Sequence, residues 1–450
     1  MKKGIEFVIS KYEIDYDTNT LYFSYQTILE GGDKLEFTEA LQFPHPLNRD
    51  IMERADVQSA IESLHILLGI SYFRLHVASH ISLSYDLTHE QADFWDTMYT
   101  KGLGEFFYLN KLDFRDLIHF PAHSPNKQPL SSQYQSDKAL VLLGGGKDSL
   151  LSVEITRKSG IHFDLFSLHT SPIQALSAGA VGKEIHMIKR TMDPLMLSLL
   201  ESKDAYVGHI PITAMYSFVA VLYSLINSYA FVVVSNEASA NYGSVEYLGM
   251  TINHQWSKSF EAEKLMQDYI QTYISTDVHY FSLLRPLHEI QIVKLFAQFK
   301  KYYTKFSSSN HNFTQTEGKQ SRWDITYSRG KVEFVFALFT AFLSKEDILT
   351  IFDDDFYAHP ECLERYMELL GKTGIKPLDC VGTPEETAVA MYMAYTGGEY
   401  KDEPIMKYFE NEVLPELDIE KLKNNVFEYG DDSRIPAQFK DALKEMCDTQ

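Results

Sequence analysis

The chain has 450 residues and a formal net charge of −21, and 45% of its residues are apolar. This length allows two or three domains with at least one large core. The strong negative charge argues against a nucleic-acid-binding protein, because such proteins usually grip the phosphate backbone with a basic face. The three cysteines have no C-x-x-C spacing, which argues against a disulfide framework and against a cysteine zinc site.

The chain start, Met1–Glu6, reaches an acidic residue without a sustained apolar run, so we expect no signal peptide. The longest apolar stretch, 218–234, contains several polar residues and indicates a helix followed by a buried strand. It is a poor candidate for a membrane span. We therefore expect a cytoplasmic protein with no membrane insertion.

Residues 1–123 are predicted to form an N-terminal α+β region. Apolar and polar residues alternate around 7–9, 21–25 and 35–37, and a Gly-Gly-Asp turn separates the last two, which predicts a β-hairpin or meander. From 51 to 108 the apolar spacing becomes helical. A polar segment, 124–132, is typical of a linker.

Strands and helices alternate in the next region, 133–284. Strands are expected at 139–143, 162–168, 205–210 and 231–235, with a helix from residue 150 and further helices at 181–190 and 213–229. This alternation predicts an α/β fold with a doubly wound parallel sheet, which binds ligands at the carboxyl ends of its strands. The last region, 285–450, is predicted to be mostly helical, with helices at 331–342, 361–370, 385–395 and 436–447.

The densest motif is a glycine-rich loop between the first strand of this region and the following helix. It consists of Gly144, Gly145, Gly146, Lys147, Asp148 and Ser149. Glycines let backbone N–H groups approach phosphate oxygens, and the helix start adds unpaired donors and the positive end of its dipole. The spacing fits neither the P-loop G-x-x-x-x-G-K-[ST] nor the dinucleotide motif G-x-G-x-x-G.

This loop resembles the S-G-G-x-D-S loop of the N-type ATP pyrophosphatases, with Gly144 in place of the first serine. The resemblance implies the adenine nucleotide alpha-hydrolase-like (PP-loop) fold, and cleavage of ATP between its α and β phosphates. It assigns the six loop residues to ATP, and Asp148 also to Mg²⁺, since a carboxylate beside a triphosphate needs a cation between them. His169 and Asn236 follow later strands and are expected at the same nucleotide site.

A second dense segment, 235–259, begins directly after the strand expected at 231–235. It carries Glu237, His254 and Lys258 among amides and hydroxyls. A loop of this kind with a tryptophan inside it is typical of a pocket wall. Structural readings stay open for single residues: Ser257 could cap the helix expected at 261–270, His254 could be a structural histidine, and Glu237 could bind backbone amides.

The glycine loop, S-N-E-x-S-A-x-x-G at 235–243 and N-H-Q-W-S-K-S at 253–259 together resemble the UDP-N-acetyl-α-D-muramoyl-L-alanyl-L-glutamate epimerase (MurL) family. The resemblance covers roughly 139–340. It implies ATP-dependent epimerisation of the terminal L-Glu of UDP-MurNAc-L-Ala-L-Glu, through adenylation of its carboxylate with release of AMP and diphosphate, in peptidoglycan precursor synthesis. The family's cysteine motif is absent at 323–331.

Inversion at carbon needs proton donors and acceptors, and our candidates in order are His254, Lys258 and Glu237, with Asp148 serving ATP cleavage. Arg285 or Lys183 could hold the acidic substrate, although an ion-paired role is favoured for both. Two other functions stay open. One is an amide or thio ligase of the same superfamily, resembling diphthine–ammonia ligase; the other is a non-catalytic nucleotide-binding protein.

Overall fold

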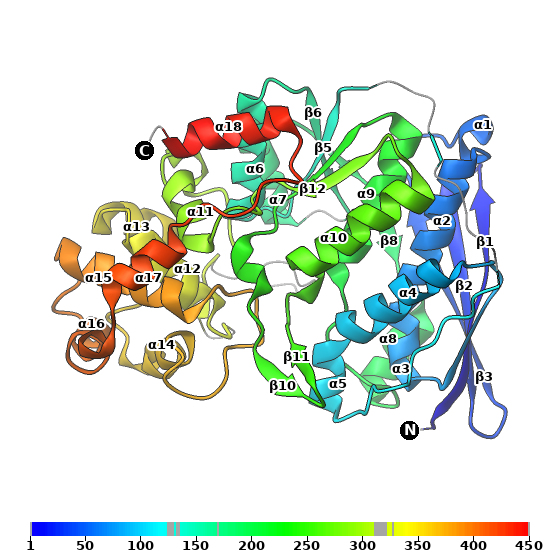
Figure 1. The fold of residues 1–450 in the computed structure, drawn as a ribbon, viewed down its shortest axis with the longest axis horizontal. Helices are drawn as coiled ribbons and strands as arrows, with labels where there is room; N and C mark the ends of the chain where they lie inside the picture. Colours follow the sequence, from blue (N-terminus) through cyan, green and yellow to red (C-terminus); the bar gives the residue numbers. More distant parts are fainter. Residues whose placement is uncertain are drawn as a thin grey trace.

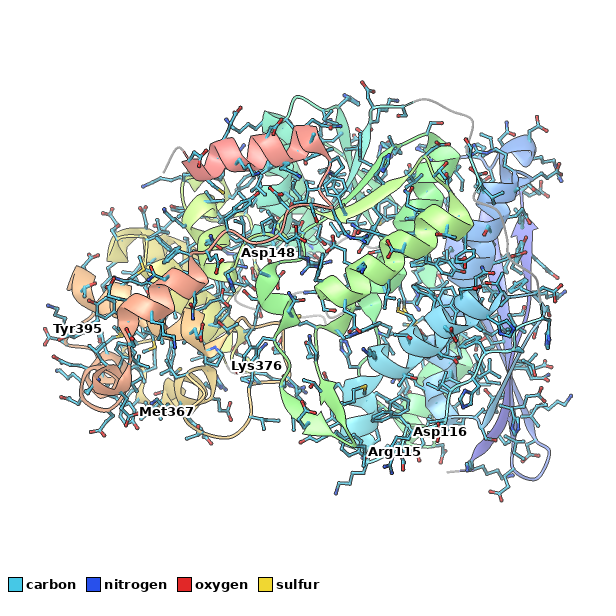
Figure 2. All side chains as sticks on the ribbon, viewed as in Figure 1. Arg115, Asp116, Asp148, Met367, Lys376 and Tyr395 are labelled. Atoms are coloured by element: carbon cyan, nitrogen blue, oxygen red, sulfur yellow. The ribbon has the colours of Figure 1, made fainter. Side chains whose placement is uncertain are left out.

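The computed structural model describes residues 2–123, 130–131, 136–168, 171–309, 322–325 and 328–448. The N-terminal sheet lies at one end of the molecule, the C-terminal helices lie at the other, and a parallel sheet lies between them (Figure 1). Asp148 is near the middle (Figure 2). His169 and most of the predicted linker fall outside the described residues.

The N-terminal sheet is built on an antiparallel meander of β1 (Gly4–Asp15), β2 (Thr20–Leu29) and β3 (Lys34–Gln42). The meander predicted from the sequence is therefore confirmed. Two later strands extend this sheet: β4 (His80–Leu83) pairs parallel with β1, and β8 (Lys189–Thr191) pairs antiparallel with β3. A segment from the predicted nucleotide region thus completes the N-terminal sheet.

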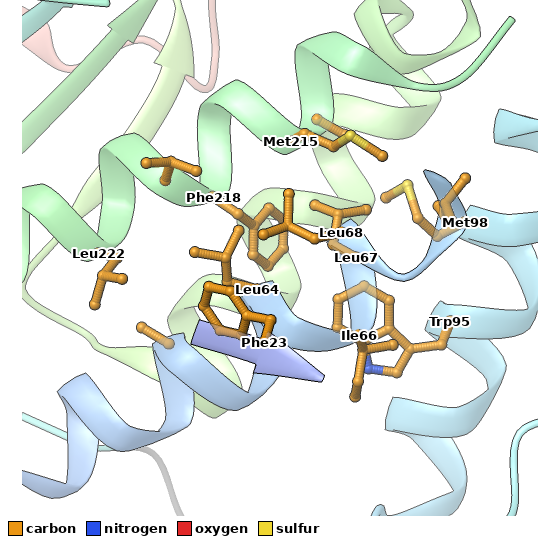
Figure 3. Packing of buried hydrophobic residues seen from close by; sticks show 14 of the residues in the cluster. Phe23, Leu64, Ile66, Leu67, Leu68, Trp95, Met98, Met215, Phe218 and Leu222 are labelled. Carbon is orange, nitrogen blue, oxygen red and sulfur yellow. The ribbon is translucent and has the colours of Figure 1, made fainter. Parts of the chain in front are cut away.

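Five helices follow the meander, and they confirm the helical spacing predicted for 51–108. Their bounds are α1 Arg49–Met52, α2 Ala55–Leu68, α3 Ile70–His76, α4 His89–Gly102 and α5 Gly104–Asn110. Buried residues of β2, α2 and α4, among them Phe23, Leu64 and Trp95, pack with Phe218 and Leu222 (Figure 3). The N-terminal region and the helix carrying Phe218 therefore share one core.

The central sheet has five parallel strands in the order β12-β9-β5-β6-β7. Their bounds are β5 Ala139–Leu142, β6 Phe163–Ser167, β7 Ile185–Met187, β9 Phe231–Val234 and β12 His279–Ser282. The sequence order of the strands reverses between β5 and β9. In open parallel sheets, the carboxyl ends of the strands at such a reversal form a crevice that binds ligands.

Both faces of this sheet are covered. Leu140 and Val232 pack into the core shared with α9 (Ile212–Asn227) and α10 (Phe260–Tyr269), whereas Val141 packs on the opposite side with α6 (Lys147–Lys158). Successive strand residues point to opposite faces, so two separate cores form. The predicted α/β class with a parallel sheet is confirmed.

The predicted helix at 181–190 is wrong. The helix of this region is α7 (Pro172–Val181), and it ends at Gly182, whose φ of 81° lies in the left-handed region. A glycine in that conformation is a common helix stop. The chain then forms the short strands β7 and β8 instead of continuing the helix.

The predicted strand at 205–210 is also wrong, because this segment is irregular and follows α8 (Pro194–Ser202). Its backbone groups pair with α3: Tyr206 donates its N–H to the carbonyl of Leu75, and the Gly208 carbonyl accepts from Arg74. In chain order, the third strand of the parallel sheet is β7 and not the segment 205–210. The predicted helix at 261–270 exists as α10, but Ser259, not Ser257, is its N-cap.

The last region is mostly helical, as predicted. Its helices are α11 Glu289–Phe296, α12 Lys331–Thr340, α13 Lys345–Phe352, α14 Leu363–Leu369, α15 Pro384–Gly397, α16 Pro404–Tyr408, α17 Ile419–Val426 and α18 Ala437–Asp448. A small hairpin of β10 (Val245–Tyr247) and β11 (Met250–Ile252) lies before them. In the described part of the chain, every helix is too short or too polar to cross a membrane.

Candidate active site

The glycine loop lies at the carboxyl end of β5, where the strand order of the parallel sheet reverses. Gly145 has a φ of +83°, and a Cβ there would lie 3.2 Å from Gln174, so the turn requires glycine. The Gly145 carbonyl accepts from the N–H of Ser307 at 3.2 Å. Helix α6 begins directly behind the loop and has no side-chain cap within the described chain. Its first N–H groups are therefore available to an anion.

A pocket of about 240 Å³ opens at this loop. Six of the residues predicted for the site line it, namely Gly144, Gly146, Asp148, Ser149, Asn236 and Lys258. Ser308, Lys331 and Cys380 also line the pocket and come from later parts of the chain. The structure thus brings the glycine loop and the segment 235–259 to one pocket.

Lys147 does not line the pocket. Its side chain is fully buried and pairs with Glu289 and, at 2.6 Å, with Oδ1 of Asp148. Burial alone would lower the pKa of Lys147, but the carboxylates of Asp148 and Glu289 raise it above its ordinary value. The positive charges that face the pocket belong instead to Lys258 and Lys331.

Asn236 and Glu237 follow β9, on the other side of the strand-order reversal. Asn236 donates from Nδ2 to Ser282 Oγ at 2.9 Å, which fixes its side chain at the pocket edge. Glu237 is buried behind the lining. Its pKa is raised well above the ordinary value, first by burial and then by the nearby Glu289 carboxylate. Glu237 is consequently prone to hold a proton near neutral pH.

The two candidate substrate cations are engaged elsewhere. Arg285 is buried, with Nε 2.7 Å from Glu263 Oε2 and its other nitrogens donating to the carbonyls of Glu237 and Lys258. It therefore fixes the backbone of the segment 235–259. Lys183 lies 3.7 Å from Asp164 and is part of the surface.

A second polar cluster, formed by Glu105, His254, Lys258 and Cys380, adjoins the pocket. His254 bonds the Glu105 carboxylate through Nδ1, and one of its ring nitrogens lies within 4.8 Å of the Cys380 sulfur. The Lys258 ammonium lies 3.3 Å from the same sulfur. Burial lowers the pKa of His254, but the nearby Cys380 and the bonded Glu105 carboxylate outweigh burial and raise it to about 10. His254 is therefore held as an imidazolium at neutral pH.

The surroundings that raise the pKa of His254 lower the pKa of the Cys380 thiol. Burial raises its pKa, but the positive charge of Lys258 and then the His254 contact lower it from 9.0 to about 6. Sequence reasoning missed Cys380 because 122 residues separate it from Lys258. The only signal in the sequence was that one cysteine precedes the helix predicted at 385–395.

The loop carrying Cys380 is held by bonds to the rest of the site. Gln255 donates from Nε2 to the Val381 carbonyl at 3.1 Å. Glu386, in the first turn of α15, is fully buried and accepts from Ser239 Oγ at 3.0 Å and from the N–H of Ile290 at 3.2 Å. These contacts attach the C-terminal helices to the carboxyl edge of the parallel sheet.

Ser308 is another pocket residue that the sequence did not indicate. It is 8% exposed, and its Oγ has no hydrogen-bond partner in the described residues. The hydroxyl lies 3.4 Å from the position that a Cβ on Gly146 would occupy. A buried polar group without a partner is costly, so this one is suited to a ligand in the pocket.

Two family models match the chain. The MurL N-terminal domain matches residues 1–283 and the MurL C-terminal domain matches residues 305–424. No solved structure matches the chain.

Several curated relatives carry the name UDP-N-acetyl-alpha-D-muramoyl-L-alanyl-L-glutamate epimerase. The protein from Xanthomonas oryzae pv. oryzae is 35% identical, over 82% of this chain and 81% of its own length. Those from Salinispora tropica and Micromonospora sp. are each 31% identical over 98% of this chain, and over 96% and 98% of their own lengths. The chain belongs to the MurL family.

Proposed function

We propose that this protein uses ATP to epimerise the terminal L-Glu of UDP-MurNAc-L-Ala-L-Glu to D-Glu, releasing AMP and diphosphate. The observation that carries the proposal is the pocket where the glycine loop and the segment 235–259 meet. Similarity over nearly the whole chain to proteins named for this epimerisation supports it. The reaction belongs to peptidoglycan precursor synthesis.

The nucleotide binds, in this proposal, at the glycine loop of a PP-loop domain. The reversal of strand order beside the loop and the coverage of both sheet faces support that fold. The α6 N–H groups, Ser149 and the unpartnered Ser308 hydroxyl supply donors for phosphate oxygens. Lys258 and Lys331 supply the positive charge. A chain with a net charge of −21 must gather such cations locally to hold a polyanion.

Asp148 suits a shared Mg²⁺ ion. It lines the pocket and is partly exposed, and one of its oxygens is bound by Lys147. Mg²⁺ is usually held by one or two carboxylates together with substrate phosphates and water. When bound, the ion would neutralise charge between Asp148 and the phosphates of ATP.

Activation of the carboxylate explains why ATP is consumed. The α-proton beside an ionised carboxylate is very weakly acidic, because the resulting enolate would carry a second negative charge. Conversion of the carboxylate to a mixed anhydride with AMP removes that charge and stabilises the enolate. Proton removal on one face, return on the other, and hydrolysis of the anhydride then give the D-glutamyl product and AMP.

The test is to incubate the protein with ATP and Mg²⁺, with and without UDP-MurNAc-L-Ala-L-Glu. We expect AMP and diphosphate only with this substrate, and D-Glu after acid hydrolysis of the product. AMP release that is indifferent to the substrate, or that needs ammonia or a thiol, would replace the epimerase with another ATP pyrophosphatase. Binding of ATP without turnover would favour a regulator.

The variant Asp148→Asn tests the role of this carboxylate in ATP cleavage separately from its role in the fold. We expect this variant to lose AMP release but to keep a cooperative thermal unfolding transition, because Asp148 is a partly exposed pocket residue and the buried Lys147 retains Glu289 as a partner. Undiminished AMP release in Asp148→Asn would contradict the assignment of this carboxylate to Mg²⁺ and ATP.

A further inference from the structure

We propose that Cys380 is a catalytic residue that exchanges a proton with the glutamyl α-carbon, and that His254 and Glu105 are its positioning residues. This inference rests on the proposed function and names the base for its proton-transfer step. His254 was the first candidate base from the sequence. The proposal assigns the role of base instead to the Cys380 sulfur, which lies near His254.

The position of Cys380 is the first argument. It lines the same pocket as Gly144, Asp148 and Asn236, so a carboxylate activated at the loop lies within the cavity that the sulfur faces. Gln255 fixes the adjoining backbone through the Val381 carbonyl. Cys380 is therefore presented to the pocket by a held loop.

The contacts of Cys380 form a chain from carboxylate to imidazole to sulfur. Glu105 is 5% exposed and bonds Nδ1 of His254, and a ring nitrogen of His254 lies within 4.8 Å of the Cys380 sulfur. A carboxylate that orients a histidine toward a thiol is the arrangement by which proteins activate cysteine. The Lys258 ammonium at 3.3 Å adds a second positive charge beside the sulfur.

The charge states of the cluster select the sulfur as the proton acceptor. His254 and Lys258 both carry raised pKa values and are cations at neutral pH, so neither has a free lone pair to accept a proton. The pKa of Cys380 is lowered to about 6. Within the cluster, the thiolate is the group that is both basic and exposed to the pocket.

A metal ion is the competing explanation for this cluster. The ligand atoms of His254, Asp379 and Cys380 lie within 4.8 Å of one another, as do those of Glu105, His209 and His254. A divalent cation bound to Cys380 would face the Lys258 ammonium at close range, which is unfavourable. The lysine thus argues for a free thiolate.

The proposed step is a proton transfer that conserves charge. The Cα–H bond breaks and an S–H bond forms on Cys380, while the C–H electron pair moves into the carbonyl of the mixed anhydride as an enolate. A proton of solvent origin is delivered to the opposite face of the α-carbon. Hydrolysis then releases AMP, and the thiol returns its proton to solvent.

The experiment compares Cys380→Ser with the wild type in D₂O. Two quantities are measured: diphosphate formed in the first turnover, and deuterium incorporated at the glutamyl α-carbon. We expect Cys380→Ser to form diphosphate at a rate near that of the wild type, and to lose deuterium incorporation by roughly 10²-fold or more. Cys447→Ser, which changes a partly buried cysteine at the far end of the chain, is the matched control and should keep both.

Deuterium incorporation by Cys380→Ser within about threefold of the wild type would overturn the proposal. Failure of the wild type to form AMP with this substrate would instead overturn the proposed function, so the two failures are distinguishable. If Cys380→Ser does not fold, Cys380→Ala is measured in the same way.

Glu105→Gln tests the positioning role. This change keeps the hydrogen bond to His254 but removes the carboxylate that favours the imidazolium. We expect the pH at which deuterium incorporation rises to move upward, because Cys380 then ionises less readily. A Glu105→Gln profile that superimposes on that of the wild type would show that Glu105 has only a structural role.

Discussion

Lys258→Met should move the ionisation of Cys380 by several pH units. The ammonium lies 3.3 Å from the sulfur, and two unit charges at this distance interact with roughly 5 kcal/mol at an effective dielectric constant of about 20. The lowering of the thiol pKa from 9.0 to about 6 corresponds to about 4 kcal/mol. Among the groups that lower this pKa, Lys258 has the largest effect, and burial opposes it.

Without this charge, the pKa of Cys380 should return to about 9 or above, since burial opposes ionisation. His254 and Lys331 remain beside the thiol and lessen the rise, while Asp379 is its acidic neighbour. A lower pKa means that the thiolate forms at lower pH. Reactivity of the wild-type thiol should therefore rise through about pH 6, and reactivity of Lys258→Met should rise near pH 9.

The assay is alkylation with iodoacetamide over a series of pH values, with the peptide that contains Cys380 quantified by mass spectrometry. The midpoint of the pH profile is the correct readout, because a less acidic thiol gives a more nucleophilic thiolate and the two effects offset at a single pH. Lys183→Met, which removes a surface lysine that pairs with Asp164, is the control and should not shift the midpoint. Equal midpoints for Lys258→Met and the wild type would refute the electrostatic reasoning.

Two further variants test the loop and the ion pair behind it. Gly144→Ala should leave the free energy of unfolding within about 0.5 kcal/mol, because a Cβ there meets nothing within 4 Å in the described chain, but it should abolish AMP release by intruding on the phosphates. Gly179→Ala, equally unobstructed but outside the pocket, should keep activity. Glu289→Ala should cost about 3–5 kcal/mol in urea unfolding because it removes the buried carboxylate that pairs with both Lys147 and Lys331, whereas removal of Asp347, which pairs with the exposed Lys300, should cost less than about 1 kcal/mol. A stable Glu289→Ala or an active Gly144→Ala would contradict these assignments.

Local patterns in the sequence were sufficient to predict the glycine loop and the strand before it, because the strand, the turn and the start of the helix all lie within about twenty residues. The segment 235–259 was found in the same way, since its polar residues directly follow a β-branched strand. The errors arose where the local pattern was ambiguous. Apolar spacing at 181–190 was consistent with a helix, and only the left-handed conformation of Gly182 stops α7 there. Residues 205–210 have strand-like composition, but their backbone groups bond to α3.

Contacts between distant segments could not be predicted without the fold. Ser308, Lys331 and Cys380 reach the pocket from three places in the last third of the chain. The hydrogen-bonded contacts that place Cys380, from Gln255 to Val381 and from Ser239 to Glu386, join residues more than a hundred positions apart. A periodicity within one helix carries no information about such pairs.

The same contacts explain why the last region is part of the site. The parallel sheet alone provides the phosphate loop and the donors at the start of α6, whereas the C-terminal helices bring Lys331 and Cys380 to the pocket. Glu386 links this arrangement to the docking of α15, because Thr383 in its own helix start bonds one oxygen of the buried carboxylate, whereas Ser239 and the N–H of Ile290 bond the other. The glycine loop and the Cys380 thiol, to which we assign ATP cleavage and proton acceptance, are therefore assembled by one contact surface. This gives a physical reason for both activities to occur in a single pocket of this chain.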